Sequence, residues 1–158
     1  MFGVSLVTLG FGFVGHELAH RYVARSYGCV AEFRLWPLGL VMAVVFALVS
    51  GGRMIFAAPG AVYIIPRSFG FGITKRENGL ISLSGPLANI LVGLAFLVLA
   101  GFEGLLGLIG SMGFTVNLWL AAFNLLPFGV LDGRKVFSWS PVAWAAVTIS
   151  AWLMIFLL

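Results

Sequence analysis

The sequence predicts an all-α polytopic membrane protein with about four transmembrane helices, and three observations support this prediction. Hydrophobic residues make up 61% of the 158 residues, whereas a soluble domain has roughly 45–50%. Charged residues make up 9%, against roughly 25% in soluble domains. The mean hydropathy is +1.12. So few charged side chains cannot cover a water-facing surface, which excludes soluble, disordered and collagen-like classes. The length suits a single domain over residues 1–158.

The apolar segments give the expected spans. A helix needs about 20 mostly apolar residues to cross the hydrocarbon core. Candidate spans cover about residues 2–24, 80–102, 104–127 and 138–158. The first lacks the basic start and small-residue cleavage site of a removable signal peptide. The last reaches the end of the sequence, so we expect no soluble domain after it.

The region between the first two spans, about residues 25–79, is expected to hold two further elements. Residues 37–52 are short for a span and open with proline, so they suit a re-entrant or interfacial segment as well as a spanning one. Residues 54–65 are rich in aromatic and β-branched residues around Pro59-Gly60. That pattern predicts one or two short strands, or a hairpin, bent at this dipeptide.

The distribution of basic residues favours the non-crossing alternative for residues 37–52. If this segment does not cross, all nine lysines and arginines fall on one side of the membrane. The positive-inside rule then makes that side cytoplasmic. If the segment did cross, four of the nine would lie outside. We therefore expect a multi-pass protein whose basic loops face the cytoplasm.

The basic character of the chain does not indicate nucleic-acid binding. The net charge is +4, but the basic residues lie between apolar segments, where they anchor a chain in the lipid bilayer. Gly10, Gly12 and Gly15 spell G-x-G-x-x-G, yet a dinucleotide site needs this motif in a soluble βαβ unit. Glycines within a membrane span more commonly let neighbouring helices approach closely. Cys29 is the only cysteine, so an intrachain disulfide is impossible.

The first span carries an H-E-x-x-H motif at residues 16–20. His16 and His20 are just over one helical turn apart, so both side chains can bind one metal ion from the same face. Glu17 is offset around the helix, where it can act as a general base rather than as a ligand. Ionisable residues inside a membrane are costly and usually functional.

A third ligand must come from an acidic residue, because the sequence has no further histidine. Glu103 falls on the opposite side of the membrane in the expected topology, while Glu32 and Glu77 lie among basic residues that can pair with them. Asp132 lies at the cytoplasmic end of the third span, where the first span also ends. Asp132 is therefore the expected third ligand, and the topology that collects the basic residues also allows the site to form.

Four sequence motifs together resemble the site-2 protease family of intramembrane zinc metalloproteases. They are H-E-L-A-H at residues 16–20, S-G-P-L-A-N at 84–89, N-L-L-P at 124–127 and L-D-G at 131–133. The resemblance covers nearly the whole chain, and the first and last motifs are more specific together than H-E-x-x-H alone. Many family members have a further span before H-E-x-x-H, so the resemblance raises the expectation of an upstream helix.

The resemblance implies a role for each site residue. His16, His20 and Asp132 would bind one Zn²⁺ per chain, and Glu17 would be the catalytic base. Asn124 matches a family asparagine thought to steady the substrate or the oxyanion. The implied activity is zinc-dependent cleavage of a peptide bond in or near a transmembrane segment of a membrane-protein substrate, at an active site toward the cytoplasmic side.

Three alternatives stand beside these assignments. Asn124 and Pro127 could instead mark the unwinding of a helix, which we weigh equally with a catalytic role for Asn124. Asn89 suits an interhelical hydrogen bond better than catalysis. The chain could also be a metal-binding membrane protein without protease activity, either a transporter or a degenerate protease. The intact Glu17 argues against the degenerate protease, since a protein that only holds a metal does not need it.

Overall fold

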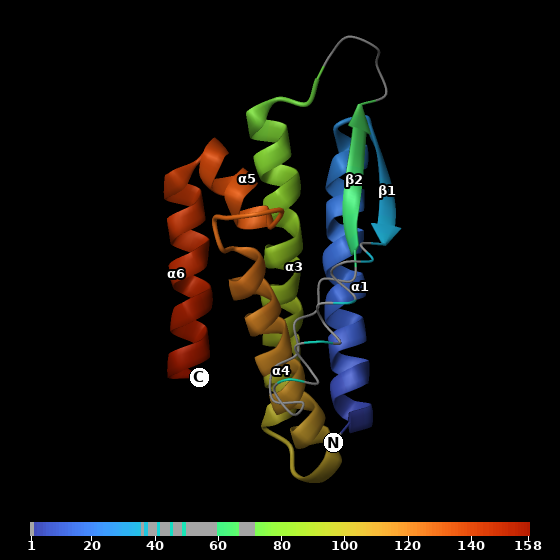
Figure 1. Ribbon diagram of the computed structural model, residues 1–158. Helices are drawn as coiled ribbons and strands as arrows, with labels where there is room; N and C mark the ends of the chain where they lie inside the picture. Colours follow the sequence, from blue (N-terminus) through green and yellow to red (C-terminus); the bar gives the residue numbers. More distant parts are fainter. Residues whose placement is uncertain are drawn as a thin grey trace.

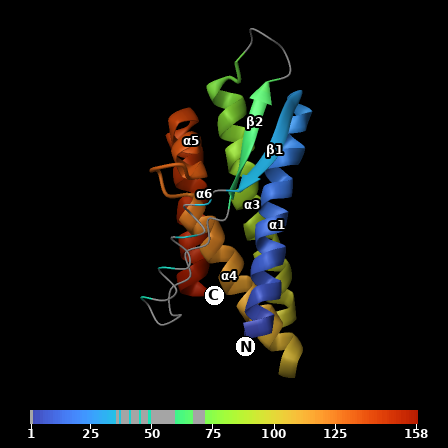
Figure 2. The same cartoon turned by 45° about the vertical axis from the view of Figure 1, so that its right-hand side comes forward.

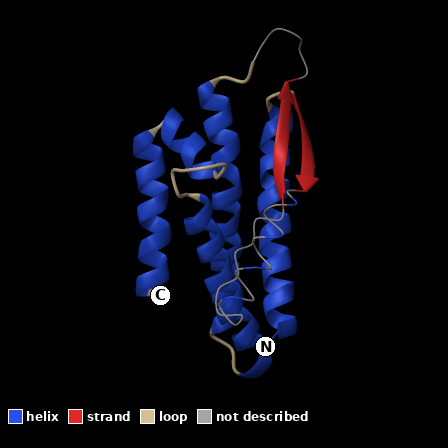
Figure 3. Cartoon of the chain, viewed as in Figure 1, coloured by secondary structure: helices blue, strands red, loops and turns tan. Residues whose placement is uncertain are grey.

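The computed structural model describes residues 2–35, 60–66 and 72–158, together with the single positions 37, 41, 45 and 49. Within this part of the chain, five named helices (α1, α3, α4, α5 and α6) accompany two strands (Figure 1). The longer helices lie side by side along one axis, and the strands form a hairpin against one end of α1 (Figures 1 and 3). The expectation of a largely helical chain with a short β element is confirmed.

Helix α1 (Phe2–Ser26) contains the whole first expected span. Its 25 residues correspond to a length of about 37 Å. The helix stops at a turn where Gly28 has a φ of 73°, a left-handed conformation that glycine adopts without steric cost. This turn leads directly into the first strand, so the end of α1 and the hairpin are joined by two residues.

Helices α3 (Lys75–Ala100) and α4 (Gly104–Asn124) correspond to the second and third expected spans, but α3 begins five residues earlier than expected and α4 ends three residues before the expected position 127. A capping box fixes this start, because Thr74 accepts a hydrogen bond from the backbone of Glu77, and Glu77 accepts one from the backbone of Thr74. Both helices are long and apolar enough to cross a membrane. Small residues let them approach, since a side chain at Gly110 would collide with the α3 backbone at Ala100.

The fourth expected span is interrupted, which corrects the prediction of one helix over residues 138–158. The structure has a short helix α5 (Asp132–Trp139) followed by α6 (Pro141–Leu157). Ser140 has an extended backbone and its side chain accepts a hydrogen bond from Ala143, which makes it the N-cap of α6. Pro141 occupies the first helical position, where its missing N–H is not needed. The helix that follows the break has 17 residues.

Strands β1 (Cys29–Leu35) and β2 (Gly60–Pro66) pair antiparallel, with Glu32 opposite Tyr63. Strand β2 confirms the second half of the strand expected over residues 54–65, whereas residues 54–59 lie outside the described part of the chain. Strand β1 was not expected, because the sequence predicted a β element only at residues 54–65. The expected re-entrant or interfacial segment, residues 37–52, also lies almost entirely outside the described residues.

Helix α3 is the central element of the bundle. It packs against α1, α4 and α5, while α6 contacts α4 and α5 on the far side (Figure 2). One cluster of buried apolar side chains joins α3, α4, α5 and α6, and includes Leu125 and Val136. This arrangement places the C-terminal half of α1, the first half of α3 and the start of α5 next to one another.

Candidate metal centre

Helix α1 presents both histidines of the H-E-x-x-H motif to the interior of the bundle. His16 is 5% exposed and His20 is 6% exposed. Their rings meet edge to face, with centroids 4.6 Å apart. The pair therefore shares one face of α1, as the four-residue spacing predicts.

Asp132 reaches the histidines from the first position of α5. It is buried, and it follows a loop over residues 125–131 that connects α4 to α5. Trp144 of α6 holds the start of this loop, because its indole Nε1 donates a 2.6 Å hydrogen bond to the carbonyl of Leu125. A side chain at Gly133 would collide with the same Leu125 carbonyl. The loop and the first turn of α5 are therefore packed tightly against each other.

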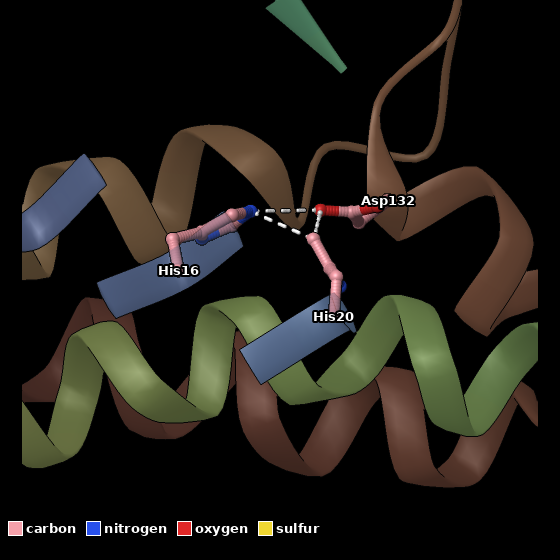
Figure 4. Close-up of side chains that lie close together, drawn as sticks. All are labelled: His16, His20 and Asp132. Atoms are coloured by element: carbon pink, nitrogen blue, oxygen red, sulfur yellow. Dashed lines mark hydrogen bonds and ion pairs between the residues drawn. The ribbon is translucent and has the colours of Figure 1, made fainter. Parts of the chain in front are cut away.

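The three candidate ligand atoms converge on one point (Figure 4). The Oδ2 atom of Asp132 lies 3.2 Å from Nε2 of His16 and 3.0 Å from Nε2 of His20. The two Nε2 atoms are 2.9 Å apart. Ligand atoms about 2.0–2.1 Å from a tetrahedral zinc ion would be about 3.3 Å from one another. The observed separations fit a zinc ion with only small movements of the side chains.

The outer nitrogen of each imidazole already has a hydrogen-bond acceptor. His16 Nδ1 lies 2.8 Å from Oδ1 of Asn89, and His20 Nδ1 lies 2.7 Å from the carbonyl oxygen of Ile81. With both Nδ1 atoms donating, both Nε2 atoms carry lone pairs toward Asp132. Three electron-pair donors that face one another without a proton between them form a cation site.

The charge of the carboxylate suits the same role. Burial raises the pKa of Asp132, but the two imidazoles that lie against the carboxylate outweigh this effect and hold that pKa well below its ordinary value. Oδ1 of Asp132 lies 3.5 Å from the ammonium of Lys135, one turn along α5. Asp132 is therefore ionised at neutral pH, as a metal ligand must be.

Glu17 lies beside the three ligands rather than among them. Its carboxylate is within electrostatic reach of His16, His20 and Asp132. Its Oε2 atom is buried and has no hydrogen-bond partner among the residues that the structure describes. A buried carboxylate oxygen without a partner is costly, and it is placed to take a proton from a molecule that enters the site.

Helix α3 passes close to the rings of both histidines, and the residue at this point is a glycine. A Cβ atom built on Gly85 would lie 2.5 Å from Nε2 of His20 and 2.6 Å from Nε2 of His16. Only a glycine lets α3 pass this close to the converging nitrogens. The sequence showed Gly85 within the S-G-P-L-A-N motif, but nothing in its spacing indicated this contact.

The other sequence candidates lie apart from this cluster. Asn124, the last residue of α4, donates a 2.9 Å hydrogen bond to the carbonyl of Leu120 in its own helix, and its catalytic role stays a prediction. Glu77 forms the capping box of α3. Among the described residues, His16, His20 and Asp132 form the group of histidine and carboxylate side chains that could hold a metal ion.

Comparisons with known proteins agree with this geometry, although no family model and no solved structure matches the chain. The chain is 45% identical over 150 residues to "Putative zinc metalloprotease MJ0611" of Methanocaldococcus jannaschii, covering 93% of this chain and 75% of that protein. It is 32% identical over 155 residues to "Putative zinc metalloprotease YwhC" of Bacillus subtilis, covering 83% and 66%. It is 26% identical over 141 residues to "Zinc metalloprotease MJ0392" of M. jannaschii, covering 84% and 33%.

Two independent results therefore agree. The structure brings two histidines and a carboxylate into a buried group that fits zinc, and the relatives carry the name of zinc metalloproteases. The similarity to the first relative extends over most of both chains. The chain belongs to the same zinc metalloprotease family as MJ0611.

Proposed function

We propose that the protein is an intramembrane zinc endopeptidase of the site-2 protease type. It cleaves a peptide bond in or near a transmembrane segment of a membrane-protein substrate. The observation that carries this proposal is the convergence of Nε2 of His16, Nε2 of His20 and Oδ2 of Asp132 beside the half-buried carboxylate of Glu17, whose Oε2 atom is buried. Metal ligands on three sides and a base at the fourth suit a catalytic zinc site rather than a structural one.

A membrane location is supported by two long apolar helices, one of which contacts the histidines of the site. Helices α3 and α4 satisfy the length and hydropathy of a membrane span, and many large apolar side chains face outward, among them Leu91 on α3 and Leu105 on α4. Outward-facing apolar side chains suit a lipid environment. The expected orientation, with the basic loops and the active site toward the cytoplasm, is part of this proposal.

The residues of the site have separate roles in the proposed reaction. A zinc ion held by His16, His20 and Asp132 would supply Lewis-acid chemistry, lowering the pKa of water toward about 7 and polarising the substrate carbonyl. Glu17 accepts a proton from the attacking water as the new C–O bond forms. Glu17 then donates that proton to the amide nitrogen as the C–N bond breaks. The carboxylate of Glu17 therefore both accepts this proton and returns it, and it ends the reaction in its starting state.

The substrate must unwind locally, because a peptide bond within a helix is shielded by its own side chains and hydrogen bonds. An outer edge of the β1–β2 hairpin could pair with such an extended segment, in the manner of β-augmentation. We expect proline at Val62, within β2, to lower cleavage at least tenfold and to leave the bound zinc unchanged. Cleavage at the wild-type rate would remove the hairpin from substrate binding.

Zinc analysis of the detergent-purified protein, with a cleavage assay on a model transmembrane substrate, tests the proposal. We expect about one zinc per chain in the wild type and in Glu17→Gln, and much less in Asp132→Ala. Cleavage should disappear in both variants, because one loses the base and the other loses a ligand. Wild-type zinc in Asp132→Ala would exclude Asp132 as a ligand. Bound zinc without cleavage of any membrane substrate would favour the non-proteolytic metal-binding protein.

A further inference from the structure

Two buried asparagines extend the hydrogen-bond network of the candidate metal centre from α1 to α4. Asn89 on α3 and Asn117 on α4 are both completely buried. Oδ1 of Asn89 lies 2.8 Å from Nδ1 of His16, and Nδ2 of Asn89 donates a 3.4 Å hydrogen bond to Oδ1 of Asn117. Nδ2 of Asn117 donates a 2.8 Å hydrogen bond to the carbonyl of Gly113. This chain of hydrogen bonds connects α1, α3 and α4.

The carbonyl of Gly113, where this series of hydrogen bonds ends, fixes the direction of each hydrogen bond in the series. The carbonyl of Gly113 can only accept, so Asn117 must present its NH₂ group there and its oxygen to Asn89. Asn89 then presents its NH₂ group to Asn117 and its oxygen to His16. Because that oxygen can only accept, His16 is held with its proton on Nδ1 and a lone pair on Nε2. The backbone of α4 thereby determines which nitrogen of His16 carries the lone pair that faces Asp132.

The two histidines are supported in different ways. The outer nitrogen of His20 faces the backbone carbonyl of Ile81, an acceptor that no side-chain rotation can reverse. His16 depends on the amide of Asn89, which could offer either its oxygen or its NH₂ group. His16 therefore needs a second group to hold the orientation of Asn89.

Helix α1 itself limits the movement of Asn117. Gly12 lies one turn before His16, and a Cβ atom built there would be 2.5 Å from Oδ1 of Asn117. The α1 backbone thus lies directly against the amide that orients Asn89. The three helices enclose the pair, and the register between α1 and α4 is linked to the position of His16.

We propose that Asn89 and Asn117 are positioning residues for the metal centre, with Asn117 acting through Asn89 to hold His16 in its metal-binding tautomer and ring orientation. This inference rests on the proposed zinc site and deepens it. Outer partners of metal-binding histidines typically change metal affinity 10- to 100-fold when they are replaced. The sequence predicted an interhelical hydrogen bond for Asn89, and the structure identifies His16 as its partner, with Nδ1 of His16 donating to Oδ1 of Asn89.

The test combines zinc affinity with the tautomer of His16 in the full-length, detergent-purified protein. Zinc Kd is measured by competition with a chromophoric chelator. The tautomers of the metal-free protein are read from imidazole ¹⁵N NMR shifts at alkaline pH, which is practical because the chain has two histidines. The variants are Asn89→Leu, which removes the acceptor, Asn89→Asp, which keeps one, Asn117→Ala, and the double variant Asn89→Leu/Asn117→Ala.

We expect Asn89→Leu to weaken zinc binding roughly 10- to 100-fold and to shift the His16 proton toward Nε2. Asn89→Asp should restore both readouts to near wild type. Asn117→Ala should weaken binding by a smaller factor, and the double variant should bind no more weakly than Asn89→Leu alone. Ser82→Ala is the matched control, because Ser82 is also buried on α3 and should leave both readouts unchanged.

Wild-type affinity and an unchanged tautomer in Asn89→Leu would overturn the proposal. Multiplied effects in the double variant would overturn the part in which Asn117 acts through Asn89. If Asn89→Leu does not fold, the test rests on the His16 tautomer of Asn117→Ala. An unchanged tautomer in that variant would also refute the inference. A wild-type protein that binds no zinc would instead contradict the proposed function, while the metal-free NMR signals would still report on the asparagine pair.

Discussion

At the scale of single residues, the missing side chain at Gly85 matters to the site as much as the ligands do. The two ligand nitrogens approach α3 at this position, and a Cβ atom would lie within 2.6 Å of both. Real Cβ atoms do not sit that close to ring nitrogens, so the histidines or the helix would have to move. The geometry of the zinc site therefore depends on a residue that has no functional group.

Gly85→Ala should abolish or strongly weaken zinc binding, although alanine favours a helix over glycine by about 1 kcal/mol. The reason is the collision with both Nε2 atoms. Gly10→Ala on α1 is the matched control, because a Cβ atom there meets nothing within 4 Å, and it should bind zinc normally. Zinc titration of both variants checks this prediction. Equal zinc affinity in the two would show that α3 can move away from the site.

At the scale of elements, the position of Asp132 depends on the loop between α4 and α5. Pro127 and Gly129 make this stretch unsuitable for continuing α4, and Gly129 has a φ of 64°. The loop is held by α6, since Trp144 donates its hydrogen bond to Leu125 within the apolar cluster. Helix α6 contributes no ligand, but it supports the element that carries one.

Trp144→Phe should lower the free energy of unfolding by about 1 kcal/mol, the typical value of one buried hydrogen bond, and should weaken zinc binding several-fold. The ring remains, so the loss reports on the Nε1–H donor. Trp152→Phe is the control on the same helix, because Trp152 contacts the rings of Trp119 and Phe156 and should keep zinc affinity. Denaturant unfolding and zinc titration measure both effects. A larger loss of affinity in Trp152→Phe would contradict this role of Trp144.

At the scale of the whole molecule, the ends of α3 should lie on opposite sides of a membrane. Its 26 residues correspond to about 39 Å, which exceeds the roughly 30 Å of the hydrocarbon core. Lys75 is exposed at one end and Glu103 is exposed beyond the other. The metal centre lies nearer the Lys75 end, because His16 and His20 contact the first half of α3.

A labelling experiment tests this arrangement in the Cys29→Ser background, which removes the single native cysteine. Lys75→Cys and Glu103→Cys should react with a membrane-impermeant maleimide from opposite sides of sealed vesicles. The positive-inside rule predicts that Lys75 is on the cytoplasmic side. Labelling of both positions from the same side would contradict a membrane-spanning α3, and reversed sides would contradict the expected orientation.

Local features of the sequence were sufficient for some of these elements and not for others. The start of α3 at Lys75 was missed by five residues, because the capping box of Thr74 and Glu77 lies in a polar stretch outside the apolar run. The break at Ser140-Pro141 was missed because the long apolar run after it dominates the hydropathy of residues 138–158. Strand β1 was missed because its pairing partner, β2, lies far along the sequence, and this pairing cannot be read from residues 29–35 alone.

The sequence by itself determined the apolar helices and the shared face of His16 and His20. Both depend on local properties, namely the hydropathy of a segment and the 3.6-residue period of a helix. It also indicated Asp132 through the side of the membrane where each span ends. Only the tertiary structure decided that Asn89, 73 residues from His16, fixes its ring, and how Asp132, 116 residues away, meets both nitrogens. Such contacts depend on how helices pack, and no local pattern encodes the distance between two helices.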